Sequence, residues 1–372
     1  MKKALTLLMC FVTAALILCS CTANAADERL SSFDEATRSQ ATRSEATKSD
    51  AAQPDTFAVK PSQIETEALD TVNETVKDSP DLPLTIKHNA VEDASVFDPY
   101  SIENLYDEIG SDMLDKHLNT DYGKIIENYE YQSDTAGDVK YCNILLPPGY
   151  NGDEEYPVLY VLHGWEGDHS DQIEPDSYLQ IVYGNMLKEE MAVPMIIVNV
   201  DMYTDILSEK DDKTGAELRD IYDKVWDDIV YDLMPQIEDT FYVKPGRDNT
   251  AIAGVSHGGT EALMTYFQYP EKFGYVAAYA SDPGIIPTDF YEEEYLNRPI
   301  YDKFPIPGFQ PYYLYMAVGT DDEYGIDVTV AYRDELNKQG MRNQTDIVEG
   351  YEHDYYFWRL CFFNFLNKIF KY

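Results

Sequence analysis

The feature that most constrains the fold is a buried strand that runs through a tight, glycine-bounded turn into a helix. Residues 250–255 have the apolar character of a buried strand, and residues 258–269 follow with a helical pattern that stops before Pro270. Between the two lies the turn Gly254-Val255-Ser256-His257-Gly258. A strand that leads directly into a helix is the building unit of an α/β protein.

The same alternation recurs along the chain. Further strands are predicted at 141–146, 158–162, 194–200, 312–318 and 346–349, and further helices at 226–241, 328–339 and 352–370. Pro235 is expected to kink or split the helix that contains it. Continuous apolar runs are typical of parallel strands that are buried on both faces. The pattern predicts an α/β domain over residues 95–372, with a mostly parallel central sheet and helices on both faces.

The N-terminal residues 1–25 have the form of a secretory signal. Lys2 and Lys3 precede an apolar run over residues 4–18, which is shorter than the roughly 20 residues of a membrane span. Two processing sites compete. A lipobox-like Leu18-Cys19-Ser20-Cys21, which we favour, predicts lipidation of Cys21, and Ala23-Asn24-Ala25 predicts ordinary cleavage. Both predict export from a bacterium, as a cell-surface lipoprotein or a secreted protein.

Residues 26–94 have the composition of a disordered tether. A five-residue repeat covers residues 35–49, and neither a helix nor a strand has that period. The segment is rich in Ser, Thr, Ala and charge, and lacks the large apolar residues that build a core.

Charge and cysteine content exclude several classes of function. The formal net charge of −40 argues against nucleic acid or an anionic membrane as a partner, so a membrane is expected only through a lipid on Cys21. The oligomeric state stays open. Five cysteines are too few for a disulfide scaffold. A single bridge between Cys142 and Cys361 stays open, but two separate buried thiols are expected.

Ser256 is the candidate nucleophile, because a serine at a strained strand-to-helix turn is presented sharply when small residues flank it. A serine hydroxyl needs a base, and His353 is the histidine that follows at a distance, between the last predicted strand and helix. The base needs an acid. Three carboxylates follow the preceding strand, Asp321, Asp322 and Glu323, and spacing does not separate Asp321 from Asp322. Asp282, which follows another apparent strand, is a more remote alternative.

The oxyanion of the reaction needs two backbone N–H donors. His257, directly after the candidate nucleophile, supplies one in this reading. Its side chain is expected to point away from the reaction, with contact to the acyl group as the alternative. Trp165, in the loop after strand 158–162, supplies the other. His163 is expected to be a structural ring under this loop. The sequence lacks paired-cysteine zinc spacing and a phosphate loop with lysine, and neither a metal nor a cofactor is expected.

These motifs together resemble the esterase D and feruloyl esterase group of α/β hydrolases, which is similar to carbohydrate esterase family 1. The resemblance rests on segments 141–150, 156–164, 252–259, 270–273 and 319–322, on His353-Asp354 and on Trp358-Arg359. It implies an α/β-hydrolase fold without a cofactor, and it favours Asp322 as the catalytic acid.

The sequence departs from that group at two places. His257 stands where Met is usual, and Trp165-Glu166 stands where Ile-Gly or Gly-Gly is common. These departures leave the acyl group open. Tyrosines near the strand ends are candidates for stacking on a phenolic acyl group or a sugar: Tyr203, Tyr279 and Tyr324.

Three functions are compatible with the sequence. The leading one is a serine carboxylesterase that hydrolyses feruloyl or acetyl esters of plant cell-wall xylan through a Ser-His-Asp acyl-enzyme. A siderophore esterase or a general short-acyl esterase is the second. The third is a non-catalytic, carbohydrate-binding surface lipoprotein, against which the set Ser256, Asp322 and His353 counts.

Overall fold

A central eight-stranded sheet organises the part of the chain that the structure describes. The structure is a computed structural model and describes residues 107–205, 215–285 and 309–371. The expected signal (1–25), the expected tether (26–94) and the first residues of the expected domain therefore lie outside the described residues. The strand order is β1-β2-β4-β3-β5-β6-β7-β8.

The sheet is mostly parallel, as predicted. The strands are β1 (Lys124–Ser133), β2 (Asp138–Leu146), β3 (Val158–Leu162), β4 (Ile196–Val200), β5 (Thr250–Val255), β6 (Tyr275–Tyr279), β7 (Tyr313–Gly319) and β8 (Gln344–Val348). β2 pairs antiparallel with β1 and with β4, and the pairs from β4 to β8 are all parallel. β1 is the strand that the sequence did not reveal, because this edge strand is largely exposed and lacks a continuous apolar run.

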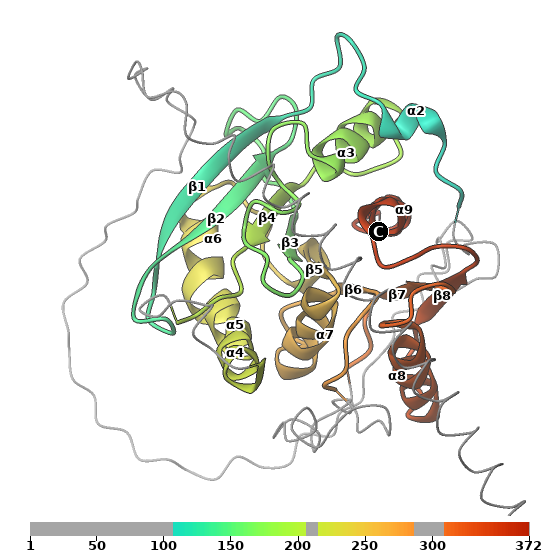
Figure 1. Ribbon diagram of the computed structural model, residues 1–372. Coiled ribbons are helices and arrows are strands. Elements are labelled where there is room, and N and C mark those ends of the chain that lie inside the picture. Colours follow the sequence, from blue (N-terminus) through green and yellow to red (C-terminus); the bar gives the residue numbers. More distant parts are fainter. Residues whose placement is uncertain (1–106, 206–214, 286–308, 372) are drawn as a thin grey trace, which may run out of the picture. The chain divides into compact units, whose positions relative to one another are not determined.

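Helices cover both faces of the sheet, which confirms the predicted layering (Figure 1). On one face, α3 (Tyr178–Lys188) and α9 (Tyr355–Leu366) pack on the sheet, with the short α2 (Ser111–Leu114) beside α3. On the other face lie α4 (Gly215–Tyr222), α5 (Val225–Asp227), α6 (Met234–Thr240), α7 (His257–Gln268) and α8 (Ile326–Lys338).

The helix predicted over residues 226–241 is helical without a break from Val225 to Thr240, but its hydrogen-bonding pattern changes ahead of Pro235. A π-helical segment, Asp228–Leu233, separates α5 from α6, and Pro235 lies in the first turn of α6. The amide N–H that proline lacks cannot contribute to regular helical hydrogen bonding. The segment carries Asp228, which is fully buried and lies 2.6 Å from the Nζ atom of the equally buried Lys140 on β2. This ion pair fastens the helical layer to the antiparallel edge of the sheet.

The two cysteines of the domain lie on opposite faces of the sheet. Cys142 on β2 belongs to the core under α4–α8, whereas Cys361 on α9 belongs to the core under α3 and α9. Both are free and buried, which confirms the prediction of two separate thiols. Burial raises the pKa of both thiols, so neither is poised as a nucleophile.

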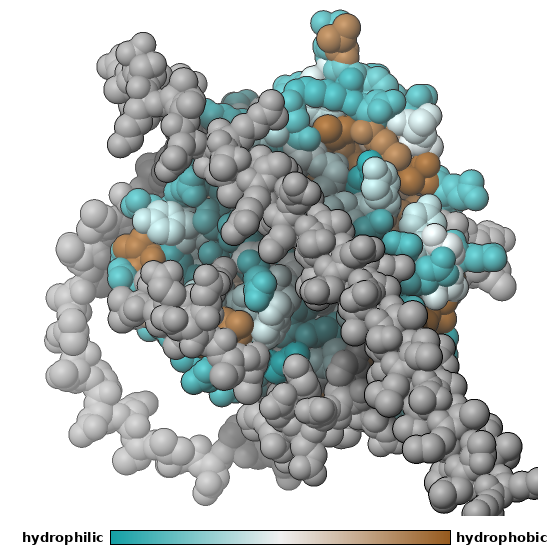
Figure 2. Space-filling model, in the orientation of Figure 1, coloured by the Kyte–Doolittle hydropathy of each residue, from teal (hydrophilic) through white to brown (hydrophobic). Residues whose placement is uncertain are grey.

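The described surface is predominantly hydrophilic on the face shown in Figure 2, with apolar residues gathered mainly near α2 and α3. None of the helices in the described ranges is long and apolar enough to cross a bilayer.

Candidate active site

Ser256 lies at the sharp turn from β5 into α7. Its backbone has φ 54° and ψ −124°, a left-handed conformation that is strained for a non-glycine residue. The flanking glycines make the turn possible. A Cβ on Gly254 would lie 2.0 Å from the carbonyl oxygen of Gly258, and a Cβ on Gly258 would lie 2.3 Å from that of His163. The turn therefore accepts only glycine at these positions, as the sequence predicted.

His353 connects Ser256 to Asp322. The Nε2 atom of His353 lies 3.0 Å from Ser256 Oγ, and its Nδ1 atom lies 2.8 Å from Asp322 Oδ2. A carboxylate only accepts hydrogen bonds, so Nδ1–H donates to Asp322 and Nε2 is left to accept the hydroxyl proton of Ser256. His353 sits in the turn between β8 and α9, and Asp322 follows β7.

Asp322, rather than the other candidate acids, contacts the histidine. Its side chain is buried, and its Oδ1 atom accepts hydrogen bonds from the backbone N–H groups of Tyr324 at 3.0 Å and Gly325 at 2.8 Å. These bonds orient Oδ2 toward His353. Asp321 is exposed and its carboxylate accepts a hydrogen bond from Thr320 at 3.0 Å.

Aromatic rings hold the imidazole of His353 from the sides. The ring centroid of Trp358 on α9 lies 5.5 Å away in an edge-on arrangement, and that of Tyr324 lies 5.9 Å away. Such arrangements restrict the rotation of the imidazole without competing for its nitrogens.

The two expected oxyanion donors lie on either side of Ser256. A Cβ on Gly164 would be 3.5 Å from Ser256 Cβ, so the loop after β3 passes directly beside Ser256, and Trp165 is its next residue. His257 is the first residue of α7, where the helix dipole adds partial positive charge. Neither backbone N–H, of Trp165 or of His257, donates to another of the described residues. Both are available to an oxygen of the substrate.

His163 and His257 are structural in the way that the sequence indicated. His163 is fully buried, with Nδ1 2.7 Å from the carbonyl of Gly164 and Nε2 accepting the backbone N–H of Met202 at 2.9 Å. The His257 side chain is also fully buried, with Nδ1 2.9 Å from Asp282 Oδ2.

The three tyrosines proposed to bind substrate differ in position. Tyr324 is 72% exposed beside His353, whereas Tyr203 is only 5% exposed. Tyr279 is a correction: its side chain is fully buried, with its ring 5.0 Å from Phe362 of α9. As the last residue of β6, it points to the sheet face that α9 covers, so it cannot stack on a substrate. Burial correspondingly raises the pKa of its hydroxyl.

Two residues near the site escaped the sequence reasoning. Tyr222 and Arg219, both on α4, contact Trp165: the ring of Tyr222 lies 5.3 Å away and the guanidinium of Arg219 lies 5.7 Å from the indole. The segment 215–222 is short and polar and has no motif, so only the packing of α4 reveals this contact.

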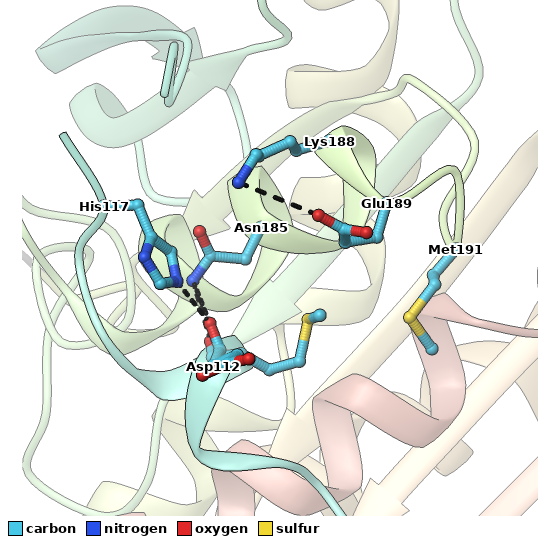
Figure 3. A pocket seen from close by; sticks show the side chains of 7 residues that line it. Asp112, His117, Asn185, Lys188, Glu189 and Met191 are labelled. Carbon is cyan, nitrogen blue, oxygen red and sulfur yellow. Dashed lines mark hydrogen bonds and ion pairs between the residues drawn. The ribbon is translucent and has the colours of Figure 1, made fainter. Parts of the chain in front are cut away.

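A pocket beside α2 and the end of α3 contains none of these residues (Figure 3). It is lined by Asp112, Met113, His117, Asn185, Lys188, Glu189 and Met191. The amide of Asn185 donates to the carbonyls of Asp112, Met113 and Asp115, and His117 contacts the carbonyl of Asp112 at 2.7 Å. These bonds fasten α2 to α3, which accounts for the polar lining. Within the described ranges no group of His, Cys, Asp or Glu is arranged to hold a metal ion.

The sequence matches a known family over most of the folded part. The model of a family described as putative esterase matches residues 133–366. Among curated proteins, the endo-1,4-beta-xylanase/feruloyl esterase of Xylanibacter ruminicola is 26% identical over 252 residues, which is 66% of this chain. The chain spans only 31% of the length of that relative.

Solved structures show the same fold. A CE1 ferulic acid esterase from Anaeromyces mucronatus, determined without substrate, is 26% identical and has a TM-score of 0.64, over 70% of this chain and 96% of that one. In complex with ferulic acid, that enzyme gives 25% identity and a TM-score of 0.63, with the same coverage. The likeness confirms the predicted α/β-hydrolase fold and the predicted resemblance to feruloyl esterases.

Proposed function

Because this chain belongs to the putative esterase family, we propose that it is a serine carboxylesterase that hydrolyses feruloyl or acetyl esters of plant cell-wall xylan. The observation that carries the proposal is the line of contacts from Asp322 through His353 to Ser256, at 2.8 and 3.0 Å. The described residues supply a nucleophile, a base and an acid in hydrogen-bond contact, which is the arrangement that acyl transfer requires.

The proposed reaction begins with the hydroxyl of Ser256. His353 Nε2 takes its proton as Oγ attacks the ester carbonyl, and the backbone N–H groups of Trp165 and His257 stabilise the negative oxygen. His353 then donates the proton to the departing alcohol, which leaves an acyl-enzyme on Ser256. Water, activated by the same imidazole, releases the acid. Asp322 keeps the imidazole in the productive tautomer and stabilises its positive charge.

The relatives support the choice of substrate. The Xylanibacter ruminicola relative carries both a xylanase and a feruloyl esterase in its name, and the Anaeromyces mucronatus enzyme was determined with ferulic acid. Tyr324 is exposed beside His353, where the departing alcohol takes up its proton, and its ring offers a face to a sugar.

An ester panel tests the proposal. The purified protein is expected to release acid from p-nitrophenyl acetate, methyl ferulate and feruloylated xylan oligosaccharides, and Ser256→Ala is expected to abolish the release. Ser281→Ala, at a buried serine that follows β6, is the matched control and should stay active. Absence of hydrolysis on every ester, a siderophore ester included, would contradict the enzyme proposal. Hydrolysis of acetate alone would contradict only the feruloyl substrate.

Export of this enzyme, with a lipid on Cys21, is proposed from the sequence of residues 1–25. An external, insoluble polysaccharide suits an esterase that is held outside the cell. Metabolic labelling with a palmitate analogue should mark the protein, and Cys21→Ala should remove the label. A labelled Cys21→Ala variant, or an unlabelled wild-type protein in the medium, would contradict the anchor.

A further inference from the structure

Four side chains behind the Ser256 turn form a closed ring of contacts. The rings of Trp165 and His257 lie 5.0 Å apart and nearly perpendicular, at 79°. His257 Nδ1 lies 2.9 Å from Asp282 Oδ2, which in turn accepts a hydrogen bond from Arg219 Nη2 at 3.1 Å. The guanidinium of Arg219 closes the ring 5.7 Å from the indole of Trp165.

The polar half of this ring is firmly held. The side chain of His257 is fully buried, that of Arg219 is 8% exposed and that of Asp282 is 22% exposed, so both bonds to Asp282 lie in a largely buried setting. Arg219 Nη1 also donates to the carbonyl of Pro283 at 2.8 Å, and the hydroxyl of Thr260 donates to the backbone carbonyl of Asp282 at 2.7 Å. Asp282 thus ties the loop after β6 to both α4 and α7.

Glu261 lies on the opposite side of the imidazole of His257. Its Oε1 atom lies 3.5 Å from His257 Nε2, and its Oε2 atom accepts a hydrogen bond from Trp226 Nε1 at 2.5 Å. The ring of His257 therefore lies between two carboxylates, and its hydrogen-bond contact among the described residues is the one between Nδ1 and Asp282.

The two aromatic members of the ring are the residues whose backbone N–H groups are the expected oxyanion donors. Their side chains contact each other, and one carboxylate fixes both of them, His257 directly and Trp165 through Arg219. They are also the two positions where the sequence departs from the feruloyl esterase pattern. Donors of an oxyanion hole must be held within tenths of an ångström of the reacting oxygen. Side-chain contacts that fix both residues restrict both peptide groups.

We propose that Asp282 is a positioning residue for the oxyanion hole, acting on His257 directly and on Trp165 through Arg219. The inference rests on the proposed esterase function. It gives Asp282 a role other than that of the catalytic acid, since the carboxylate contacts His257 and Arg219 while Asp322 contacts His353.

The test compares an oxygen ester with its thionoester, whose C=S sulfur accepts hydrogen bonds poorly and therefore depends less on the oxyanion donors. For Asp282→Asn and for Arg219→Met, we expect kcat on the oxygen ester to fall about 10- to 100-fold. That is less than the roughly 100- to 1,000-fold effect of losing a donor outright. KM should change little. The ratio of oxygen-ester to thionoester kcat should fall about tenfold, because the donors are misplaced rather than the nucleophile.

Two further variants separate positioning from general damage. His257→Asn keeps a donor where Nδ1 lies and should retain more activity than His257→Leu, which removes it. Asp346→Asn changes another buried carboxylate, on β8, and should lower stability without changing the ester ratio.

Equal falls on both esters, or an unchanged kcat in Asp282→Asn, would overturn the positioning role while leaving the esterase proposal intact. A wild-type protein without activity on either ester would overturn the esterase proposal, and the positioning role with it.

Discussion

Replacing Asp322 by asparagine changes the charge and hydrogen bonding of the proposed acid with little change in shape. Three N–H groups converge on its carboxylate: His353 Nδ1 at 2.8 Å, Tyr324 N at 3.0 Å and Gly325 N at 2.8 Å. A carboxylate accepts all three, whereas a carboxamide has one accepting oxygen and a donating NH₂ group. Since the two backbone N–H groups meet the same side-chain oxygen, the amide oxygen will face them and the NH₂ group will face His353.

The consequence is the wrong tautomer of the histidine. An NH₂ group at that position requires Nδ1 to accept, so the proton of the neutral imidazole moves to Nε2, which then cannot take the proton of Ser256. The negative charge that stabilises the imidazolium is lost as well. We expect kcat to fall by about 10⁴-fold, which corresponds to about 5.4 kcal/mol in the activation free energy.

Initial rates on p-nitrophenyl acetate measure this effect, with Ser256→Ala as the baseline. Asp321→Asn is the matched control, because the carboxylate of Asp321 is exposed and accepts a hydrogen bond from the hydroxyl of the neighbouring Thr320. It should stay within about twofold of wild type, as expected for an exposed change away from the reacting groups. The reasoning is refuted if Asp322→Asn keeps more than about a tenth of the wild-type kcat, or if Asp321→Asn falls equally far.

Three further predictions concern stability and reactivity. Gly258→Ala should lower the free energy of unfolding by ~2 kcal/mol or more in urea titrations, because its Cβ would lie 2.3 Å from a carbonyl oxygen. Lys140→Met should cost about 3–5 kcal/mol in the same assay, since it leaves the buried carboxylate of Asp228 without its cation. Cys142 and Cys361 should resist iodoacetamide at pH 8 until the protein unfolds, because a raised pKa lowers the thiolate fraction and burial blocks access.

Controls accompany each of these measurements. Gly110→Ala should be neutral, because a Cβ there meets no atom within 4 Å. The double variant Lys140→Met/Asp228→Leu should be more stable than Lys140→Met alone, since no unpaired charge remains. Peptide mass spectrometry assigns the labelled cysteines. A neutral Gly258→Ala, a loss below about 1 kcal/mol in Lys140→Met, or rapid labelling of the native thiols would each contradict the corresponding argument.

Local features of the chain were readable from the sequence because their causes are local. A buried parallel strand needs an apolar run within about six residues, and the turn at Ser256 needs glycines two residues to either side. The chain order of Ser256, the acid and His353 also follows from the order of strands. The edge strand β1 and the polar helix α4 escaped because neither carries a continuous apolar run or a motif.

Tertiary contacts, rather than the sequence pattern, decide which of several similar residues lies at the site. Periodicity put Tyr279 near a strand end, but which face of the sheet its side chain occupies depends on how α9 packs over β6. Spacing left Asp282 open as an acid, whereas the fold pairs it with Arg219, 63 residues away in the chain.

The sequence by itself therefore determined the layered α/β fold, the turn that presents Ser256 and the choice of His353 as the candidate base. Spacing did not decide between Asp321 and Asp322 as the acid, and the resemblance to feruloyl esterases favoured Asp322. The contact of Asp322 with His353, and that of His353 with Ser256, join residues that are 31 and 97 positions apart. No pattern within one strand or helix encodes such distances, because they depend on how the ends of β5, β7 and β8 meet at one edge of the sheet.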